Sequence, residues 1–324
     1  MKTIFVINPK AGNGKNIEKL KKYIKDSSEQ LKADVEIYVT KAVGDAKKFV
    51  EQHCKTKGSA RFIACGGDGT LSEVLNGAIG QEGTEIGVMP IGTGNDFCRN
   101  FFGKGNFMSA ISQMSGESVK CDAIRYHTYF EGTEKTGYSA NMFNIGFDCN
   151  VADLTNTIKK KSFVFGSFAY ILSIFAILIK KKGANLQMEL DGNVKHKGKL
   201  LLTSIANGCF CGGGVMSNPL ADVNDGFINL NIIRDVSRLK LLTLLPRYMK
   251  GTHIRMKNIE NVIFNSRCKK VVITPDGGNM RLCIDGEIID AGTTEFTIVH
   301  NAFNFVIPNN VMFDENTKEK VCVD

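Results

Sequence analysis

The chain has 324 residues, enough for two domains, and its 43% hydrophobic and 23% charged content is ordinary for a soluble globular protein. The net charge of +8 suits a phosphorylated ligand or an anionic membrane surface, but the basic residues are dispersed and no nucleic-acid motif accompanies them, so we expect no nucleic acid partner. Ten cysteines without a CxxC pair argue against a zinc site and suit a reducing cytosol.

The first third of the chain alternates strand and helix patterns. Near-continuous apolar runs predict strands, which lie at Thr3–Ile7, Val35–Val39, 62–65 and 86–89. Helical patterns separate them, and Asp45 is expected to cap the second helix. Fully apolar strands between helices indicate a parallel sheet that is covered on both faces.

Three glycine-rich loops follow these strands, at residues 8–14, 66–70 and 92–96. Ligands of parallel sheets bind at the carboxyl ends of the strands, and the helix that follows Gly66-Gly67-Asp68-Gly69-Thr70 offers its N-terminus to a phosphate. The Asp68 carboxylate suits such a site if a divalent cation or a proton lies between it and the phosphate. The loops together predict a phosphoryl-transfer site, although this stretch alone is also consistent with a plain turn.

The pattern becomes β-rich beyond residue 121. Short strand patterns, one of them at 138–143, alternate with Asp-Gly turns and predict a sandwich of antiparallel sheets. Helical segments interrupt them at about 151–160, 166–182 and 237–250. The apolar stretch at 163–179 lies at or below the lower limit for a spanning helix, and we interpret it as a helix that is buried or touches a membrane.

In this order the motifs resemble the diacylglycerol kinase catalytic family in its bacterial form, a family that also includes the sphingosine kinases. The resemblance rests on Asn8-Pro9-Lys10-Ala11-Gly12, on GGDGTLSEVLNG at 66–77 and on PIGTGNDF at 90–97. It continues through Asn207-Gly208, Gly212-Gly213-Gly214, Pro219, Ala221, Asp225-Gly226 and Asp285-Gly286-Glu287. It thus covers nearly the whole chain, although GGDGT alone is shared with NAD kinases and partly with phosphofructokinases.

The resemblance implies a two-domain fold. A Rossmann-like α/β nucleotide-binding domain of the NAD kinase and diacylglycerol kinase type would span 1–122, with 301–324 returning to it and 303–307 packing there. An all-β, sandwich-like lipid-substrate domain would span 123–300, and the active site would lie between the two domains.

The resemblance also implies roles for individual residues. Residues expected at ATP, by this likeness or by their place in the glycine loops, are Asn8, Pro9, Lys10, Ala11, Gly12, Thr40, Gly66, Gly67, Gly69, Thr70, Leu71, Ser72, Glu73, Thr93 and Asn95. Asp68 would act in the phosphate–metal network, and either Asp285 or Glu287 would be the base that activates the lipid hydroxyl. Asp222, Asp225 and the carbonyl of Phe227 would hold a structural Mg²⁺, with a simple Asp-Gly hairpin as the alternative.

The function expected from this resemblance is an ATP- and Mg²⁺-dependent lipid kinase that converts diacylglycerol to phosphatidic acid. The enzyme would be cytoplasmic and peripheral to the inner membrane surface, touching anionic lipid through the lysine clusters at 159–161 and 180–182. Whether the protein forms a homodimer stays open. Two alternatives also stay open: a soluble small-molecule kinase of the NAD kinase type, and a non-catalytic lipid- or nucleotide-binding relative.

Overall fold

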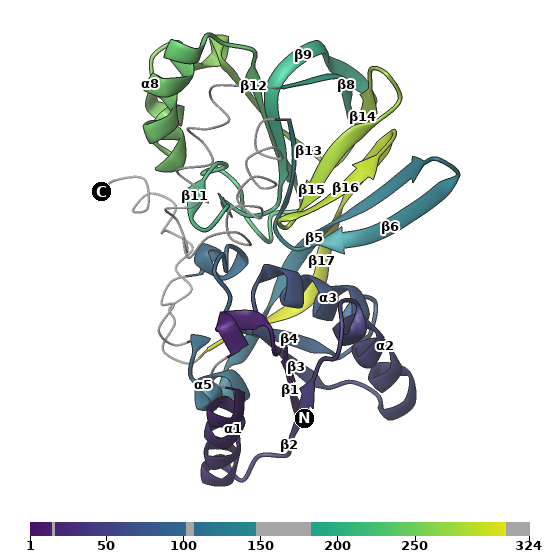
Figure 1. Cartoon of the computed structure of the whole chain (residues 1–324), viewed down its shortest axis with the longest axis vertical. Helices are drawn as coiled ribbons and strands as arrows, with labels where there is room; N and C mark the ends of the chain where they lie inside the picture. The colour runs from purple at the N-terminus through teal and green to yellow at the C-terminus, as the bar shows by residue number, and fades with distance from the viewer. Residues whose placement is uncertain (15–16, 102–106, 147–182, 309–324) are drawn as a thin grey trace. The chain divides into compact units, whose positions relative to one another are not determined.

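The computed structural model describes residues 1–14, 17–101, 107–146 and 183–308 (Figure 1). The chain divides into two compact units, of which the first contains residues 1–122 and 301–308 and the second contains residues 123–300. The helices expected at 151–160 and 166–182, the apolar stretch at 163–179 and the lysine clusters at 159–161 and 180–182 lie outside the described residues.

The first unit is built on a parallel sheet, as the sequence predicts. Its strands are β1 (Thr3–Ile7), β2 (Val35–Val39), β3 (Arg61–Gly66) and β4 (Glu85–Pro90), in the order β2-β1-β3-β4. The end of β17 (Thr294–Ile307) adds a further parallel strand beside β4, where Phe305 pairs with Ile86. Residues 303–307 therefore pack in this unit, as the resemblance implies.

Helices cover both faces of this sheet (Figure 1). The helices α1 (Ile17–Leu31) and α5 (Ala110–Ser115) lie on one face, where Ile24 and Ala110 pack against Phe5 and Ile63. The helices α2 (Asp45–Lys57) and α3 (Asp68–Ala78) contact each other on the opposite face, where His53 meets the ring of Phe62 edge-on. Short 3₁₀ turns, η1 (Ala11–Gly14) and η2 (Phe97–Asn100), follow β1 and β4.

The start of α2 differs from the sequence-based expectation that Asp45 caps it. The N-cap residue is Gly44, at φ +80°, and it makes no side-chain cap. The Glu73 carboxylate from α3 caps the helix instead, because it accepts hydrogen bonds from the backbone N–H groups of Gly44 at 2.9 Å and Ala46 at 3.1 Å. Asp45 accepts from the Lys41 N–H and the Tyr38 hydroxyl, so its carboxylate holds the preceding loop.

The second unit consists mainly of antiparallel strands. Its strands, besides the start of β17 and the end of β5 (Glu117–Phe130), are β6 (Thr133–Ser139), β7 (Met142–Gly146), β8 (Ala184–Leu190), β9 (Asn193–Ala206), β10 (Phe210–Cys211), β11 (Val215–Met216), β12 (Ile228–Arg234), β13 (Ile263–Cys268), β14 (Lys270–Pro275), β15 (Met280–Ile284) and β16 (Glu287–Ala291). The main sheet runs β16-β15-β7-β9-β8-β14-β17, and β9 also pairs with β12. The β-rich sandwich-like unit predicted from the sequence is confirmed.

The prediction of a single strand at 138–143 is wrong, because two different strands, β6 and β7, meet there. β6 ends at Ser139 and pairs with β5, whereas β7 begins at Met142 and pairs with β9 and β15. The N–H of Asn141 bonds the Ser139 hydroxyl at the break. The apolar residues on either side of this break belong to different strand pairs, which local patterning cannot distinguish.

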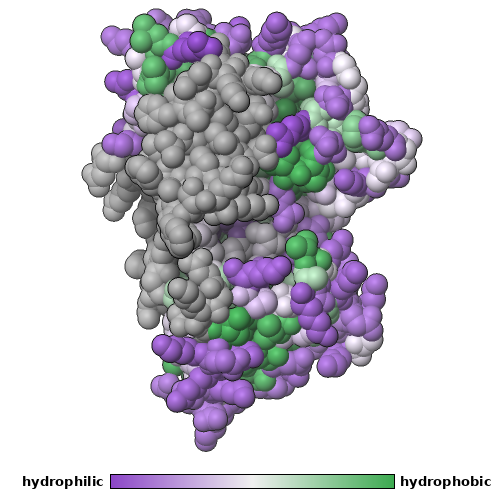
Figure 2. Space-filling model, in the orientation of Figure 1, coloured by the Kyte–Doolittle hydropathy of each residue, from purple (hydrophilic) through white to green (hydrophobic). Residues whose placement is uncertain are grey.

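One described helix of the second unit, α8 (Arg238–Met249), begins after the Ser237 N-cap, whose hydroxyl accepts from the Lys240 N–H. Leu241, Leu244 and Tyr248 anchor it in a hydrophobic cluster that includes residues of β9, β12 and β13. The surface around α8 carries both hydrophobic and hydrophilic residues (Figure 2), and Leu239 and Leu242 are exposed there. Among the helices that the structure describes, none has the length and apolar character needed to cross a bilayer.

Candidate active site

The three glycine loops meet at the carboxyl ends of β1, β3 and β4. The Asn8 N–H donates to the Cys65 carbonyl at 3.0 Å, and the Asn8 side-chain amide donates to the Thr70 hydroxyl at 3.1 Å. The Gly92 N–H donates to the Gly66 carbonyl at 3.1 Å. The convergence predicted from the sequence is therefore present in the structure.

Glycine is needed where two of these loops touch. A Cβ at Gly92 would lie 2.4 Å from the Gly67 Cα, closer than any side chain can sit. Gly12 has a φ of +59°, and a Cβ there would lie 3.0 Å from the Ile91 carbonyl oxygen. The third loop is closed by Asn95, whose side-chain amide donates to the Pro90 and Gly92 carbonyls. The loops thus form one tightly packed assembly.

Asp68 connects the second loop to the third. It is the first residue of α3, and its Oδ1 accepts hydrogen bonds from the backbone N–H groups of Asp96 at 2.7 Å and Phe97 at 3.2 Å. A Cβ at Gly94 would lie 2.8 Å from the Asp68 Oδ2. Burial raises the pKa of the Asp68 carboxyl, and these N–H groups oppose that rise. The observed role of Asp68 is to brace the loops, and its role at phosphate and metal stays a prediction.

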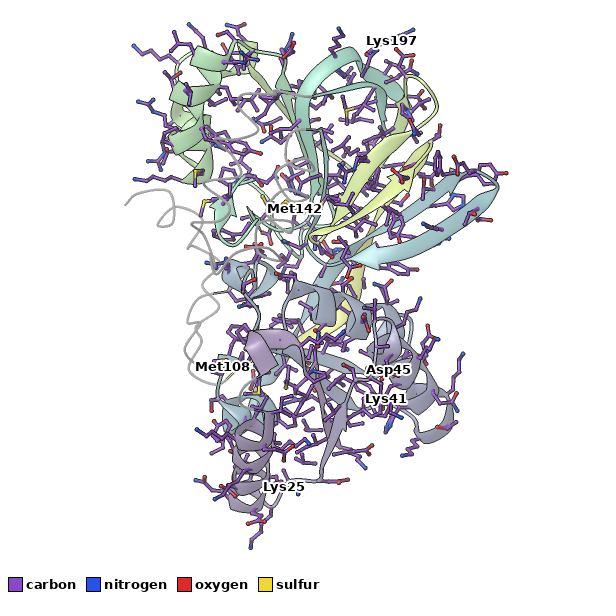
Figure 3. The ribbon with its side chains drawn as sticks, in the orientation of Figure 1. Lys25, Lys41, Asp45, Met108, Met142 and Lys197 are labelled. Carbon is purple, nitrogen blue, oxygen red and sulfur yellow. The ribbon has the colours of Figure 1, made fainter. Side chains whose placement is uncertain are left out.

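A small pocket of about 70 Å³ opens beside this assembly. It is lined by Asn8, Pro9, Lys10, Thr40, Lys41, Ala42, Val43, Ala46, Thr70 and Glu73. Six of these residues were expected at the nucleotide. The loop at 41–43 was not expected at the nucleotide, although its place after β2, directly beyond Thr40, was the available signal. Figure 3 shows Lys41 and Asp45 close together at the start of α2.

Several expected nucleotide residues have structural partners of their own. The Glu73 carboxylate is engaged by the N–H groups of Gly44 and Ala46, so it positions the 41–46 loop. Leu71 is buried in the first unit, and the Ser72 carbonyl accepts from the Asn76 side chain. Gly69 lies in the first turn of α3, Ala11 lies in η1, and Thr93 lies in the third loop between Gly92 and Gly94.

In the second unit, Asp285 and Gly286 form the two-residue turn of the β15–β16 hairpin, with φ of +46° and +95°. The Asp285 Oδ1 accepts from the Ser139 hydroxyl at 2.7 Å and from the Met142 N–H at 3.2 Å. Glu287 begins β16 and is exposed. The two candidate bases therefore differ, because Asp285 fastens its turn to β7 and Glu287 faces solvent.

Tyr126 on β5 lies near both carboxylates. Its pKa is raised by burial and, to a smaller extent, by the negative charges of Glu287 and Asp285. Its ring also meets that of Phe143 edge-on at 5.5 Å. Tyr126 was not among the expected site residues, because nothing in its neighbourhood on β5 marks it as different from any other strand residue.

The two acids expected to hold a structural Mg²⁺ have partners within the chain itself. The Asp225 Oδ1 accepts from the Phe227 N–H at 3.0 Å, and its Oδ2 pairs with the Arg267 guanidinium at 2.6 Å. Asp222 accepts from the Asn224 N–H. In the part of the chain that the structure describes, no three Asp, Glu, His or Cys side chains form a metal cluster. This arrangement does not fit a divalent cation, because Arg267 already neutralises Asp225.

A glycine-loop assembly on a parallel α/β sheet, followed by an antiparallel β unit, defines the fold that diacylglycerol kinases and NAD kinases share. The family model described as "Diacylglycerol kinase catalytic domain" matches residues 2–126. The model described as "YegS C-terminal NAD kinase beta sandwich-like domain" matches residues 141–307. The chain therefore belongs to the diacylglycerol kinase catalytic family.

Relatives with curated names are similar along most of the chain. A diacylglycerol kinase of Staphylococcus aureus strain MRSA252 is 28% identical over 315 residues, which cover 96% of this chain and 93% of the relative. One of Mycobacterium tuberculosis strain H37Rv is 28% identical over 256 residues, which cover 78% and 79%. The crystal structure of a diacylglycerol kinase from Bacillus anthracis strain Sterne shares the fold, with a TM-score of 0.69, 19% identity, and coverage of 96% and 98%.

Proposed function

We propose that this protein is a lipid kinase that transfers the γ-phosphoryl group of ATP, bound as its Mg²⁺ complex, to the hydroxyl of diacylglycerol. The product is phosphatidic acid, and the enzyme works at the cytoplasmic surface of the membrane that holds its substrate. The observation that carries the proposal is the packed assembly of the three loops around the N-terminus of α3. Family membership supports the kinase class.

The first unit supplies the phosphate-binding half of the reaction. Backbone N–H groups in the first turn of α3 and the positive end of its dipole favour an anion beside Gly69 and Thr70. The Lys10 side chain and the Thr40 and Thr70 hydroxyls provide a cation and hydroxyl groups around the small pocket. Such a preorganised set stabilises the charge of a transferring phosphoryl group without rearranging during the reaction.

The second unit supplies the base. We assign this role to Glu287, because it is exposed whereas Asp285 holds the hairpin turn against Ser139 and Met142. The Glu287 carboxylate takes the proton of the acceptor hydroxyl as the hydroxyl oxygen forms the new bond to the γ-phosphorus. The bond between the γ-phosphorus and its bridging oxygen breaks, and ADP leaves. Magnesium, when it accompanies ATP, neutralises charge on the phosphates.

The test is phosphorylation by the purified full chain with γ-labelled ATP and a panel of diacylglycerol, sphingosine, a polyprenol and NAD. We expect the label in phosphatidic acid, at a rate at least tenfold above that for each other acceptor, since a hydroxyl held out of register with the phosphate reacts slowly. Label in NADP would favour the NAD kinase type. Nucleotide binding without transfer to any acceptor would favour a non-catalytic relative.

A further inference from the structure

The outward side of α8 carries apolar side chains that the rest of the described chain does not cover. Successive helical residues are rotated by about 100°, so Leu239, Leu242 and Pro246 fall on one side, opposite the buried Leu241, Leu244 and Tyr248. Leu239 is 74% exposed and Leu242 is 44% exposed. We call the surface formed by Leu239, Leu242, Thr243, Pro246 and Lys250 the α8 outer face.

Cations surround the α8 outer face. Residues 234–250 contain five exposed cations, Arg234, Arg238, Lys240, Arg247 and Lys250, against a single acid, Asp235. In helical projection Lys240 and Arg247 border the apolar stripe on one side and Arg238 borders it on the other. Two further exposed cations, Arg255 and Lys257, follow shortly after the helix. The whole chain, by contrast, has 41 basic and 33 acidic residues, so the local excess is far above the average.

Leucines bordered by cations on one side of a helix match the chemistry of an anionic bilayer surface. The leucines fit at the boundary between headgroups and acyl chains, and the lysines and arginines reach the lipid phosphates. A second copy of the chain is a poor occupant, because two α8 outer faces in contact would bring like charges together. The strand hairpin β8–β9 also exposes lysines, at 195, 197 and 199, but no leucine lies among them.

We propose that the α8 outer face docks this protein on an anionic lipid bilayer. The proposal rests on the proposed function for its purpose, since a kinase of diacylglycerol must reach a substrate that stays in the membrane. The α8 outer face is a membrane-contacting surface separate in sequence from the lysine clusters at 159–161 and 180–182. Docking here is reversible, because one short helix buries too little apolar surface for permanent anchoring.

Vesicle sedimentation of the full chain tests the proposal. Vesicles contain equal parts of phosphatidylglycerol and phosphatidylcholine, and pure phosphatidylcholine vesicles serve as the neutral comparison. We expect Leu239→Gln/Leu242→Gln to weaken partitioning to the anionic vesicles at least tenfold, and Lys240→Gln/Arg247→Gln to weaken it and to reduce its salt dependence. Both variants should keep the wild-type melting temperature, because the changed side chains are exposed.

Matched controls isolate the α8 outer face. Leu220→Gln removes a leucine that is 55% exposed elsewhere in the second unit, and Lys195→Gln/Lys197→Gln removes two cations from β9. Both controls should partition like the wild type. Equal partitioning of the wild type and the Leu239→Gln/Leu242→Gln variant would overturn the proposal. So would a wild-type dimer that this variant dissociates, since the face would then bind a second copy.

Measurements of kinase activity distinguish the docking proposal from the proposed kinase function. On a short-chain diacylglycerol dispersed as monomers, Leu239→Gln/Leu242→Gln should retain the wild-type rate, because no bilayer is needed there. If the wild type phosphorylates no lipid but its vesicle binding still depends on the leucines, the kinase proposal fails and the docking surface stands. If the wild type phosphorylates the dispersed lipid and the leucines do not affect vesicle binding, only the docking proposal fails.

Discussion

The backbone N–H of Asp96 donates a 2.7 Å hydrogen bond to the Oδ1 of Asp68, so a carboxylate at the start of α3 holds the third glycine loop in place. Phe97 donates to the same oxygen at 3.2 Å. The shape of the candidate phosphate site therefore depends on an acid that need not touch the phosphate itself.

Replacing Asp68 should destabilise the protein as well as impair it. Asp68→Ala leaves two backbone N–H groups without their acceptor, and we expect a loss of roughly 2–4 kcal/mol in the free energy of unfolding. Urea unfolding measures the change. Asp68→Asn is the control, because its amide oxygen can still accept these bonds. If Asp68→Asn is as stable as the wild type but inactive, the carboxylate has a direct role in transfer as well; if Asp68→Ala unfolds like the wild type, the brace contributes nothing.

Glu73 should act on nucleotide binding through the loop that it holds. Glu73→Ala leaves the N–H groups of Gly44 and Ala46 uncapped at the start of α2, which should cost about 1–2 kcal/mol of stability. Since the 41–46 loop lines the pocket, we expect a several-fold rise in the KM for ATP with a smaller fall in kcat. Glu73→Gln, which keeps one acceptor oxygen, should recover much of both. A fall in kcat with an unchanged KM would instead indicate that Glu73 supports an interaction made only in the transition state.

Substitutions of the two acids at the β15–β16 turn, Asp285 and Glu287, should have different effects on activity and stability. Glu287→Gln should lower kcat by about 10²–10⁴-fold at an unchanged melting temperature, because it removes the proposed base, whose side chain is exposed. Asp285→Asn should lower stability by about 1 kcal/mol, because it weakens the bonds to Ser139 and Met142, while asparagine still tolerates the left-handed backbone at this position. Wild-type rates for Glu287→Gln together with an inactive Asp285→Asn would exchange the two roles.

Stability should fall in mild acid because of His253. Burial lowers its pKa from 6.5 to about 4, so between these values the unfolded chain binds a proton that the folded chain does not. The contribution of neutral His253 is therefore complete above pH 6.5 and is lost as the pH falls toward 4, by about 2 kcal/mol at pH 5. Urea unfolding at pH 7 and pH 5 checks this.

His253→Gln is the control for that measurement, and it should flatten the pH dependence. Burial also lowers the pKa of His53, which makes the free energy of unfolding depend on pH in the same direction. The His253→Gln variant is therefore compared with the wild type at both pH values. An unchanged slope in His253→Gln would assign the acid sensitivity to other groups.

Magnesium should not stabilise the folded chain in the absence of nucleotide. Arg267 already pairs with Asp225 and lies over the ring of Phe227 at 4.4 Å, so it supplies the positive charge that a structural metal would bring. We expect the melting temperature to be the same in EDTA and in excess Mg²⁺. Arg267→Ala should lower it, and only that variant should respond to Mg²⁺. A rise of several degrees for the wild type would instead restore the metal site expected at Asp222, Asp225 and Phe227.

The fold was predictable where the determining pattern is local. Continuous apolar runs mark β1 and β3, and their burial in a two-sided parallel sheet follows from that pattern. Glycines after those strands predict the meeting of the loops, because only glycine permits the contact between Gly67 and Gly92.

What the sequence did not reveal depends on contacts between distant residues. Glu73 caps α2 from 27 positions away from Ala46, and a local pattern favours Asp45 for that cap. Tyr126 and Arg267 look like ordinary strand residues until β5 and β13 place them beside acids. The break between Ser139 and Met142 is decided by which strands pair on either side, a property of the sheet that the segment itself does not encode.

Hydrogen–deuterium exchange of the full chain with a non-hydrolysable ATP analogue tests the central claim most directly. If the nucleotide binds at the three-loop assembly, backbone exchange should slow together at 8–14, 40–46, 66–73 and 92–97, the segments that the structure ties to one another or to one pocket. Unchanged exchange in these segments, or protection confined to residues 123–300, would contradict the account.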